Sequence, residues 1–188
     1  MKKYLVFFSC LLILATGLKL QGQSSKSEYS IINKIHLPGE GGWDYLSVDE
    51  AGGRLFVSHG TVVQVVDLKT SQLVGTVAET PGVHGIAIAQ DLNKAFISVG
   101  RNASVKVIDL KSLAVIIDVK ITGENPDAIT YDQFSKKVFV FNGRTANATV
   151  LDAVTNDVVG TISLEGKPEF PASDGFHPSC NTSEFDCI

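Results

Sequence analysis

The chain has 188 residues, of which 44% are hydrophobic and 19% charged, and its formal net charge is -4 at pH 7. This composition is too apolar for an intrinsically disordered chain, and it lacks the basic excess of a nucleic-acid-binding protein. We therefore expect a globular protein with no nucleic-acid partner.

The N-terminus has the layout of a bacterial-type secretory signal peptide over residues 1–23. Two lysines precede an apolar run from Tyr4 to Leu18, and a polar stretch follows. The run is short for a membrane-spanning helix, which needs roughly 20 residues. We expect cleavage near Gly22 or Gln23 and an exported protein, which would be periplasmic, on the cell surface or secreted. An uncleaved N-terminal anchor is the alternative.

The segment Tyr29 to Leu37, YSIINKIHL, is rich in β-branched and aromatic residues and ends at Pro38-Gly39. This composition predicts a strand followed by a turn. The segment resembles the ends of two later segments, LVGTVAETPG and VVGTISLEGKP. We therefore expect it to be the last strand of a unit whose other strands do not lie upstream.

A unit then occurs three times, most clearly in VQVVDLKTSQLVGTV, VKVIDLKSLAVIIDVKI and TVLDAVTNDVVGTI. The aspartates that these copies share, Asp67, Asp109 and Asp152, are 42 and 43 residues apart. A fixed period in this range is typical of repeat architectures. Because they recur at equivalent positions, we interpret them as hydrogen-bond acceptors in the turn after each third strand, not as catalytic groups.

Each copy contains four short segments of strand composition, and no stretch beyond the signal peptide shows helical periodicity. Polar hexamers built on Asp49, Asp91 and Asp132 separate the first strand from the second and predict turns. The twelve predicted strands are Tyr45 to Val48, Arg54 to Ser58, Val62 to Asp67, Leu73 to Val77, Gly85 to Ala89, Ala95 to Val99, Val105 to Asp109, Val115 to Ile121, Ala128 to Tyr131, Lys137 to Phe141, Ala148 to Asp152 and Val158 to Ser163.

Four-stranded units of about 40 residues without helices are what a β-propeller blade requires, because each blade covers its apolar faces with its neighbours. The second strands, LFVS, AFIS and VFVF, are nearly continuous apolar runs, which predicts inner strands packed on both faces. We therefore predict an all-β fold: a partial β-propeller of about three four-stranded antiparallel blades over residues 29–175.

The second and third copies, KAFISVGRNASVKVIDLKSLAVIIDVKI and KVFVFNGRTANATVLDAVTNDVVGTI, share a further order of features. An apolar strand ends in Gly, a variable loop follows, and then come a strand ending in Asp, a turn and a last strand. This order resembles the YVTN-type β-propeller repeat found in exported and surface proteins. The resemblance covers roughly Tyr29 to Gly175 and implies the fold, whereas such propellers serve binding, scaffold and enzymatic roles.

The pattern stops near the C-terminus. GKPEFPASDG looks like the first strand and turn of a fourth blade, but FHPSCNTSEFDCI lacks an apolar second strand. We expect an irregular tail over residues 176–188 and an incomplete ring, since propellers usually have four to eight blades. A truncated product is the favoured interpretation; a half-propeller that closes as a dimer and an open arc are the alternatives. Self-association would cover the exposed blade edges.

Two cysteines remain once the signal peptide is removed, Cys180 and Cys187. In an oxidising compartment they can form a disulfide, and two free thiols are the alternative.

A binding face is expected at one end of the blades, because antiparallel strands bring the loop before strand one and the loop after strand two together. Trp, His, Arg and Asn side chains there can bind an anionic or sugar-like ligand by stacking and by guanidinium contacts. Solvated turn residues are the alternative interpretation. The candidates are Trp43, Asp44, His84, Asn125 and Asp127 before the first strands, and His59, Arg101, Asn142 and Arg144 after the second.

No catalytic residue, metal or cofactor is predicted. His59 and His84 lie on different blades without a carboxylate at a fixed spacing, and no nucleotide-binding, hydrolase or zinc-binding motif is present in the sequence. We predict an exported binding or scaffold module for an unidentified small molecule or protein. The alternative is a fragment of a propeller enzyme, such as a lactonase-type hydrolase or a periplasmic oxidoreductase, which convergence of His, Glu and Asp at the axis of a closed ring would favour.

Overall fold

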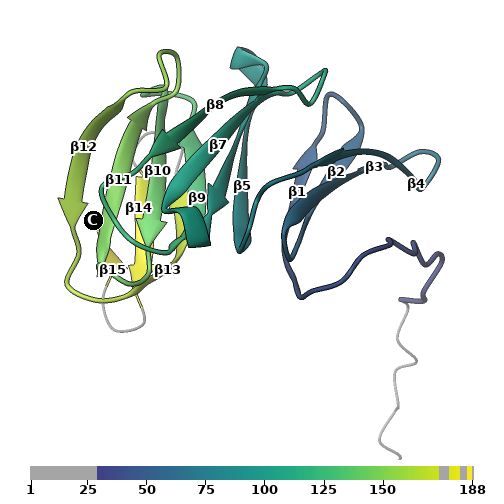
Figure 1. Ribbon diagram of the computed structural model, residues 1–188, viewed down its shortest axis with the longest axis horizontal. Coiled ribbons are helices and arrows are strands. Elements are labelled where there is room, and N and C mark those ends of the chain that lie inside the picture. The colour runs from purple at the N-terminus through teal and green to yellow at the C-terminus, as the bar shows by residue number, and fades with distance from the viewer. Residues whose placement is uncertain (1–28, 174–177, 183–185, 188) are drawn as a thin grey trace, which may run out of the picture. The chain divides into compact units, whose positions relative to one another are not determined.

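The computed structural model describes residues 29–173, 178–182 and 186–187 (Figure 1). The predicted signal peptide, residues 1–23, lies outside this part. The chain divides into two units, Met1–Lys34 and Ile35–Ile188, and the account below concerns the second. Within the described ranges, no helix has the length and apolar character needed to cross a bilayer.

Three four-stranded sheets follow one another, each an antiparallel meander whose strands pair in chain order. They confirm the predicted all-β fold, an unclosed β-propeller (Figure 1). Two short 3₁₀ helices, η1 (Gln90–Leu92) and η2 (Gly100–Asn102), interrupt the second blade. The blades are β1 (Trp43–Asp49), β2 (Arg54–His59), β3 (Val62–Asp67) and β4 (Gln72–Val77); β5 (Val83–Ala89), β6 (Lys94–Val99), β7 (Ser104–Asp109) and β8 (Val115–Lys120); and β9 (Pro126–Asp132), β10 (Lys137–Asn142), β11 (Asn147–Asp152) and β12 (Val158–Ser163).

A fourth sheet has three strands, β13 (Pro168–Ser173), β14 (Pro178–Thr182) and β15 (Asp186–Cys187). The segment expected to be an irregular tail therefore contains two strands. Pairing of this kind uses backbone amides and carbonyls, which a polar segment supplies as well as an apolar one. The register places Cys180 opposite Cys187. Their side chains lie outside the described part, so the disulfide stays a prediction.

The strand predicted over Tyr29 to Leu37 is not formed, since residues 29–42 contain no strand. A strand requires an adjacent strand with a free edge. In the described part of the chain, no sheet includes these residues.

The turns after the third strands confirm the structural role predicted for their aspartates. Asp67, Asp109 and Asp152 each accept hydrogen bonds at Oδ1 from the backbone amides two and three residues ahead, over 2.7–3.1 Å. Lys137 also bonds to Asp152, and this contact together with the amide bonds lowers the pKa of that carboxyl to about 2. These aspartates fix the shape of the repeat.

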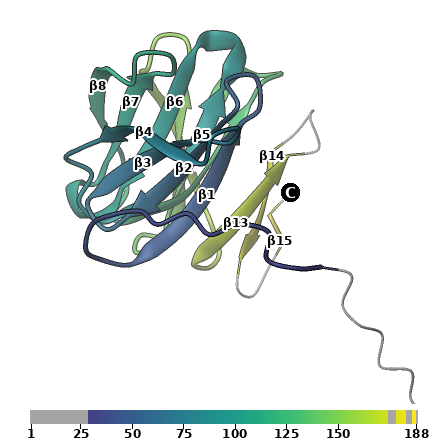
Figure 2. The same ribbon diagram turned by 90° about the vertical axis from the view of Figure 1, so that its right-hand side faces the viewer.

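Apolar side chains fill the space between consecutive blades. Phe56 and Phe96 occupy the same position in their blades and are fully buried, one facing the second blade and the other the third. On the first strands, Ile86 and Ile129 are 5% and 8% exposed, whereas Leu46 at the equivalent position is 64% exposed. Figure 2 views the molecule from the side of this first blade. Each blade therefore covers the face of the next blade on which these first-strand side chains lie.

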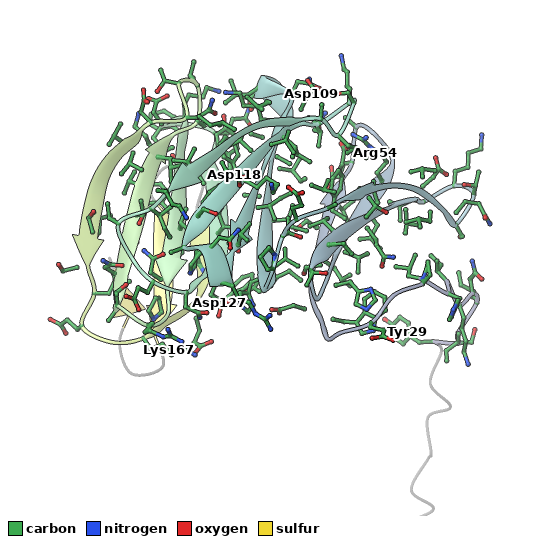
Figure 3. All side chains as sticks on the ribbon, viewed as in Figure 1. Tyr29, Arg54, Asp109, Asp118, Asp127 and Lys167 are labelled. Atoms are coloured by element: carbon green, nitrogen blue, oxygen red, sulfur yellow. The ribbon has the colours of Figure 1, made fainter. Side chains whose placement is uncertain are left out.

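In the first and second blades, a cation at the start of the second strand reaches the next blade. Arg54, labelled in Figure 3, donates to the Leu110 carbonyl at 2.6 Å. Lys94, at the equivalent position, donates from Nζ to the Ala153 and Val154 carbonyls at 2.9 and 2.8 Å, and to Asn156 Oδ1. In both cases the acceptor lies in the turn after the third strand of the following blade.

Replacing Lys94 with methionine is expected to lower the free energy of unfolding by about 1–3 kcal/mol, because the carbonyls of the third blade lose a charged donor. Urea denaturation of both proteins measures this difference. Lys111→Met is the control, since Lys111 is exposed in a turn of the same blade. Equal losses in the two variants would contradict the role of Lys94 between blades.

Candidate functional site

A β-bulge interrupts the beginning of every first strand. The register shifts between Trp43 and Leu46 in β1, between Val83 and Ile86 in β5, opposite the end of β10 in β9, and near the start of β13. A bulge changes the direction of the side chains beside it, and such irregularities are frequent next to functional sites. The residue at the second position of each of these strands is charged or titratable: Asp44, His84, Asp127 and Glu169.

Two serines of the second strands hold the bulges in place. Ser58 Oγ accepts from the Tyr45 amide at 2.7 Å and donates to the Tyr45 carbonyl at 3.0 Å. Ser98 Oγ accepts from the Gly85 amide at 2.8 Å and donates to the Asp127 carbonyl at 2.6 Å. Ser98 therefore fixes the backbone of Asp127 against the second blade.

Three of the bulge residues meet. His84 Nδ1 donates to Asp44 Oδ2 at 2.6 Å and lies 3.9 Å from Asp127 Oδ1. The nearest ligand atoms of these three side chains all lie within 4.8 Å of one another. All three side chains are partly exposed, so solutes can reach them. We call Asp44, His84 and Asp127 the inner cluster.

The inner cluster carries an excess of negative charge. Burial raises the pKa of Asp127; the nearby His84 opposes this rise, and the carboxylates of Asp44 and Glu169 add to it. Burial and the same three carboxylates raise the pKa of Tyr45 to about 12. The electrostatic environment therefore favours a positive charge.

His59 does not join His84. Its ring stacks on Trp43 with 3.7 Å between ring centroids and an interplanar angle of 12°. His59 is buried, and Nδ1 lies 3.1 Å from Gln64 Oε1, while Gln64 donates to the Pro38 carbonyl at 2.7 Å. His59 is therefore part of the interior of the first blade, with Trp43 as its partly exposed cover.

Asn142, a binding candidate in the sequence, occupies the same repeat position as His59 and is also buried. Its Nδ2 donates to Asn147 Oδ1 at 2.8 Å and to Thr149 Oγ1 at 3.0 Å. Because the side chain is enclosed in the third blade, a ligand from solvent does not contact it in this conformation. We leave it out of the binding site.

A second group of candidates surrounds a hollow between the second and third blades. It has a volume of about 490 Å³. Arg101 and Arg144 follow Gly100 and Gly143 at equivalent repeat positions. The Arg144 guanidinium is 3.8 Å from a Glu124 carboxylate oxygen, and both side chains are exposed. The Arg101 side chain has no hydrogen bond or ion pair with any described residue. The lining residues are Gly100, Arg101, Ala103, Glu124, Asn125 and Arg144.

Sequence reasoning missed Glu169 and Glu124. Glu169 is held by Lys167, whose Nζ donates to Glu169 Oε1 at 2.7 Å (Figure 3 labels Lys167 and Asp127). An alignment of WDYL, VHGI, PDAI and PEFP by their second residues would have found Glu169.

Comparison with known proteins shows the fold. A scan against protein-family models found no match, and neither did a search of curated proteins. Among solved structures, Kuenenia stuttgartiensis hydrazine synthase is similar, with a TM-score of 0.70 and 20% identity over 84% of this chain and 47% of that one. The structures of U3-55K and of the RRP9 WD40 repeats are also similar. Each has a TM-score of 0.66 and 9% sequence identity, over 73% of this chain and 44% of the matched chain.

The chain is a β-propeller module. At these identities the likeness shows the fold alone. The chain spans about half the length of the propeller structures that it matches.

Proposed function

We propose that this chain is an exported, YVTN-type β-propeller module that binds a small anionic molecule at the end of its second and third blades. The observation that supports this most directly is the hollow with two guanidinium groups from equivalent repeat positions, Arg101 and Arg144. The signal-peptide layout of residues 1–23 supports export.

The chemistry of the hollow suits a carboxylate or a phosphate. A guanidinium group presents a planar fork of donors that matches the two oxygens of such anions, and the Asn125 amide can add a neutral donor. Among the described residues the Glu124 side chain forms an ion pair with Arg144 and none with Arg101, which leaves the Arg101 guanidinium available to a ligand. Because both arginines face solvent, we expect moderate affinity that falls as salt concentration rises.

Thermal unfolding with glucuronate tests this proposal. Millimolar glucuronate is expected to raise the Tm of the protein, since a ligand that binds only the folded state stabilises it. Glucose at the same concentration, which lacks the carboxylate, should give no rise. Arg101→Ala and Arg144→Ala should each weaken the effect about tenfold in ligand concentration.

The matched control is Lys69→Ala, which removes an exposed cation from a turn of the first blade. An equal Tm rise in the wild type, in Arg101→Ala and in Arg144→Ala would refute this site.

The enzymatic alternative required His, Glu and Asp to converge in a closed ring. His84 and two aspartates do converge, in the inner cluster. The pair of equivalent arginines around one hollow is the observation that favours binding as the proposed function.

A further inference from the structure

We propose that the inner cluster, Asp44, His84 and Asp127, binds a divalent transition-metal ion that accepts mixed nitrogen and oxygen ligands, such as Mn²⁺. This site shares no residue with the lining of the arginine-lined hollow, although the His84 ring lies beside Gly100 of that hollow. The proposal does not depend on the proposed anion binding.

The distances fit a shared ion. Metal bonds to imidazole nitrogen and carboxylate oxygen are about 2.0–2.4 Å long, so two atoms on one ion are at most about 4.8 Å apart. The three ligand atoms of the inner cluster satisfy this limit in every pair. One side chain rotation that moves Asp44 Oδ2 away from His84 Nδ1 would open the space between them.

The ligands come from three strands, which limits their freedom before an ion binds. Each side chain sits at a bulge of its first strand, β1, β5 or β9. Ser98 ties the backbone of Asp127 to the second blade, beside His84. Such support reduces the ordering cost of binding and is typical of metal sites that work on rigid scaffolds.

The carboxylates of the inner cluster and its surroundings favour the binding of a cation. Two carboxylates face one imidazole, and Glu169 adds a third carboxylate nearby that Lys167 neutralises in part. In the metal-free protein the Nδ1 proton of His84 bonds to Asp44. On binding, the Nδ1 lone pair coordinates the ion and Nε2 carries the ring proton, so an imidazole that starts neutral changes tautomer with no net release of a proton, whereas an imidazolium releases one.

The donor set also indicates which ions fit. Ca²⁺ and Mg²⁺ prefer oxygen ligands alone, whereas imidazole with carboxylates suits Mn²⁺ and the later first-row ions. Mn²⁺ is the better probe than Zn²⁺ here, because thiolates such as those of Cys180 and Cys187 bind Zn²⁺ strongly.

Titration of the full chain with Mn²⁺, followed by the loss of the free-ion EPR signal, tests the site. We expect one equivalent to bind, and His84→Ala and Asp127→Asn each to raise the Kd at least tenfold. His36→Ala is the control, since His36 is exposed and lies outside the inner cluster. Circular dichroism in metal-free buffer verifies that every variant is folded.

Absence of Mn²⁺ binding to the wild-type protein would overturn the proposal. So would unchanged binding in His84→Ala, or a loss in His36→Ala as large as that in His84→Ala. A Ca²⁺ concentration equal to that of Mn²⁺ should leave most of the Mn²⁺ bound, and complete displacement would contradict coordination by imidazole.

Discussion

Replacing Phe96 with alanine is expected to lower the free energy of unfolding by about 3–5 kcal/mol, the usual cost of removing a buried phenyl ring. Phe96 is fully buried in the apolar layer between the second and third blades, together with Val107 and Ile129. The cavity left behind is flanked by two sheets whose backbones are fixed by strand pairing, so it can collapse only in part. Urea denaturation at equilibrium measures the loss.

Phe134→Ala is the matched control, because Phe134 is 72% exposed. We expect it to change the free energy of unfolding by less than about 0.5 kcal/mol. Phe139→Ala, at the equivalent position of the third blade but only partly buried, should give an intermediate loss. If Phe96→Ala and Phe134→Ala were equally stable, the apolar layer would not be the source of stability between blades.

The substitution Gly85→Ala is expected to cost about 1–3 kcal/mol by overpacking and to disturb the inner cluster. A Cβ atom at Gly85 would lie 2.8 Å from Ile129 Cγ2 and 2.9 Å from the Asp127 carbonyl oxygen. Backbone cannot move aside as a flexible side chain can. The third blade would therefore shift away from His84, and Mn²⁺ affinity should fall together with stability.

Gly160→Ala separates crowding from the general effect of losing a strand glycine. A Cβ at Gly160 would meet only Val150 Cβ, at an ordinary 3.9 Å. This variant should be as stable as the wild type or slightly more so, because alanine reduces the freedom of the unfolded chain. Unfolding free energies that fall equally in both variants would argue against a close approach of the blades at Gly85.

The strands and their order were predictable because the sequence contains three copies of the repeat, so each strand could be compared across three segments. The bounds predicted for Val62 to Asp67 and Val158 to Ser163 match β3 and β12, and most other strands differ by a residue or two at their ends. Turn chemistry was equally clear at Asp67, whose carboxylate accepts the local amides as expected. Local patterns and local bonds thus determine most of the fold.

The candidate site was predictable in part. Asp44, His84 and Asp127 were all candidates, but their meeting depends on bulges, which depend on strand register and have no sequence pattern. One of the aspartates predicted to build the turns between first and second strands also behaves differently. Asp91 lies in η1 and contacts Tyr131 and Lys136 of the next blade. Contacts between blades cannot be inferred from one blade's sequence.

The contacts of Arg54 and Lys94 give the stack of blades a direction. Each cation extends from one blade to carbonyls in the turn of the blade after it, so the two sides of a contact present different groups. Surfaces of this heterologous kind join head to tail, and they produce rings when the rotation closes and filaments when it does not. The exposed face around Leu46 corresponds to the one that meets the rear of the preceding blade in the two later contacts of this kind.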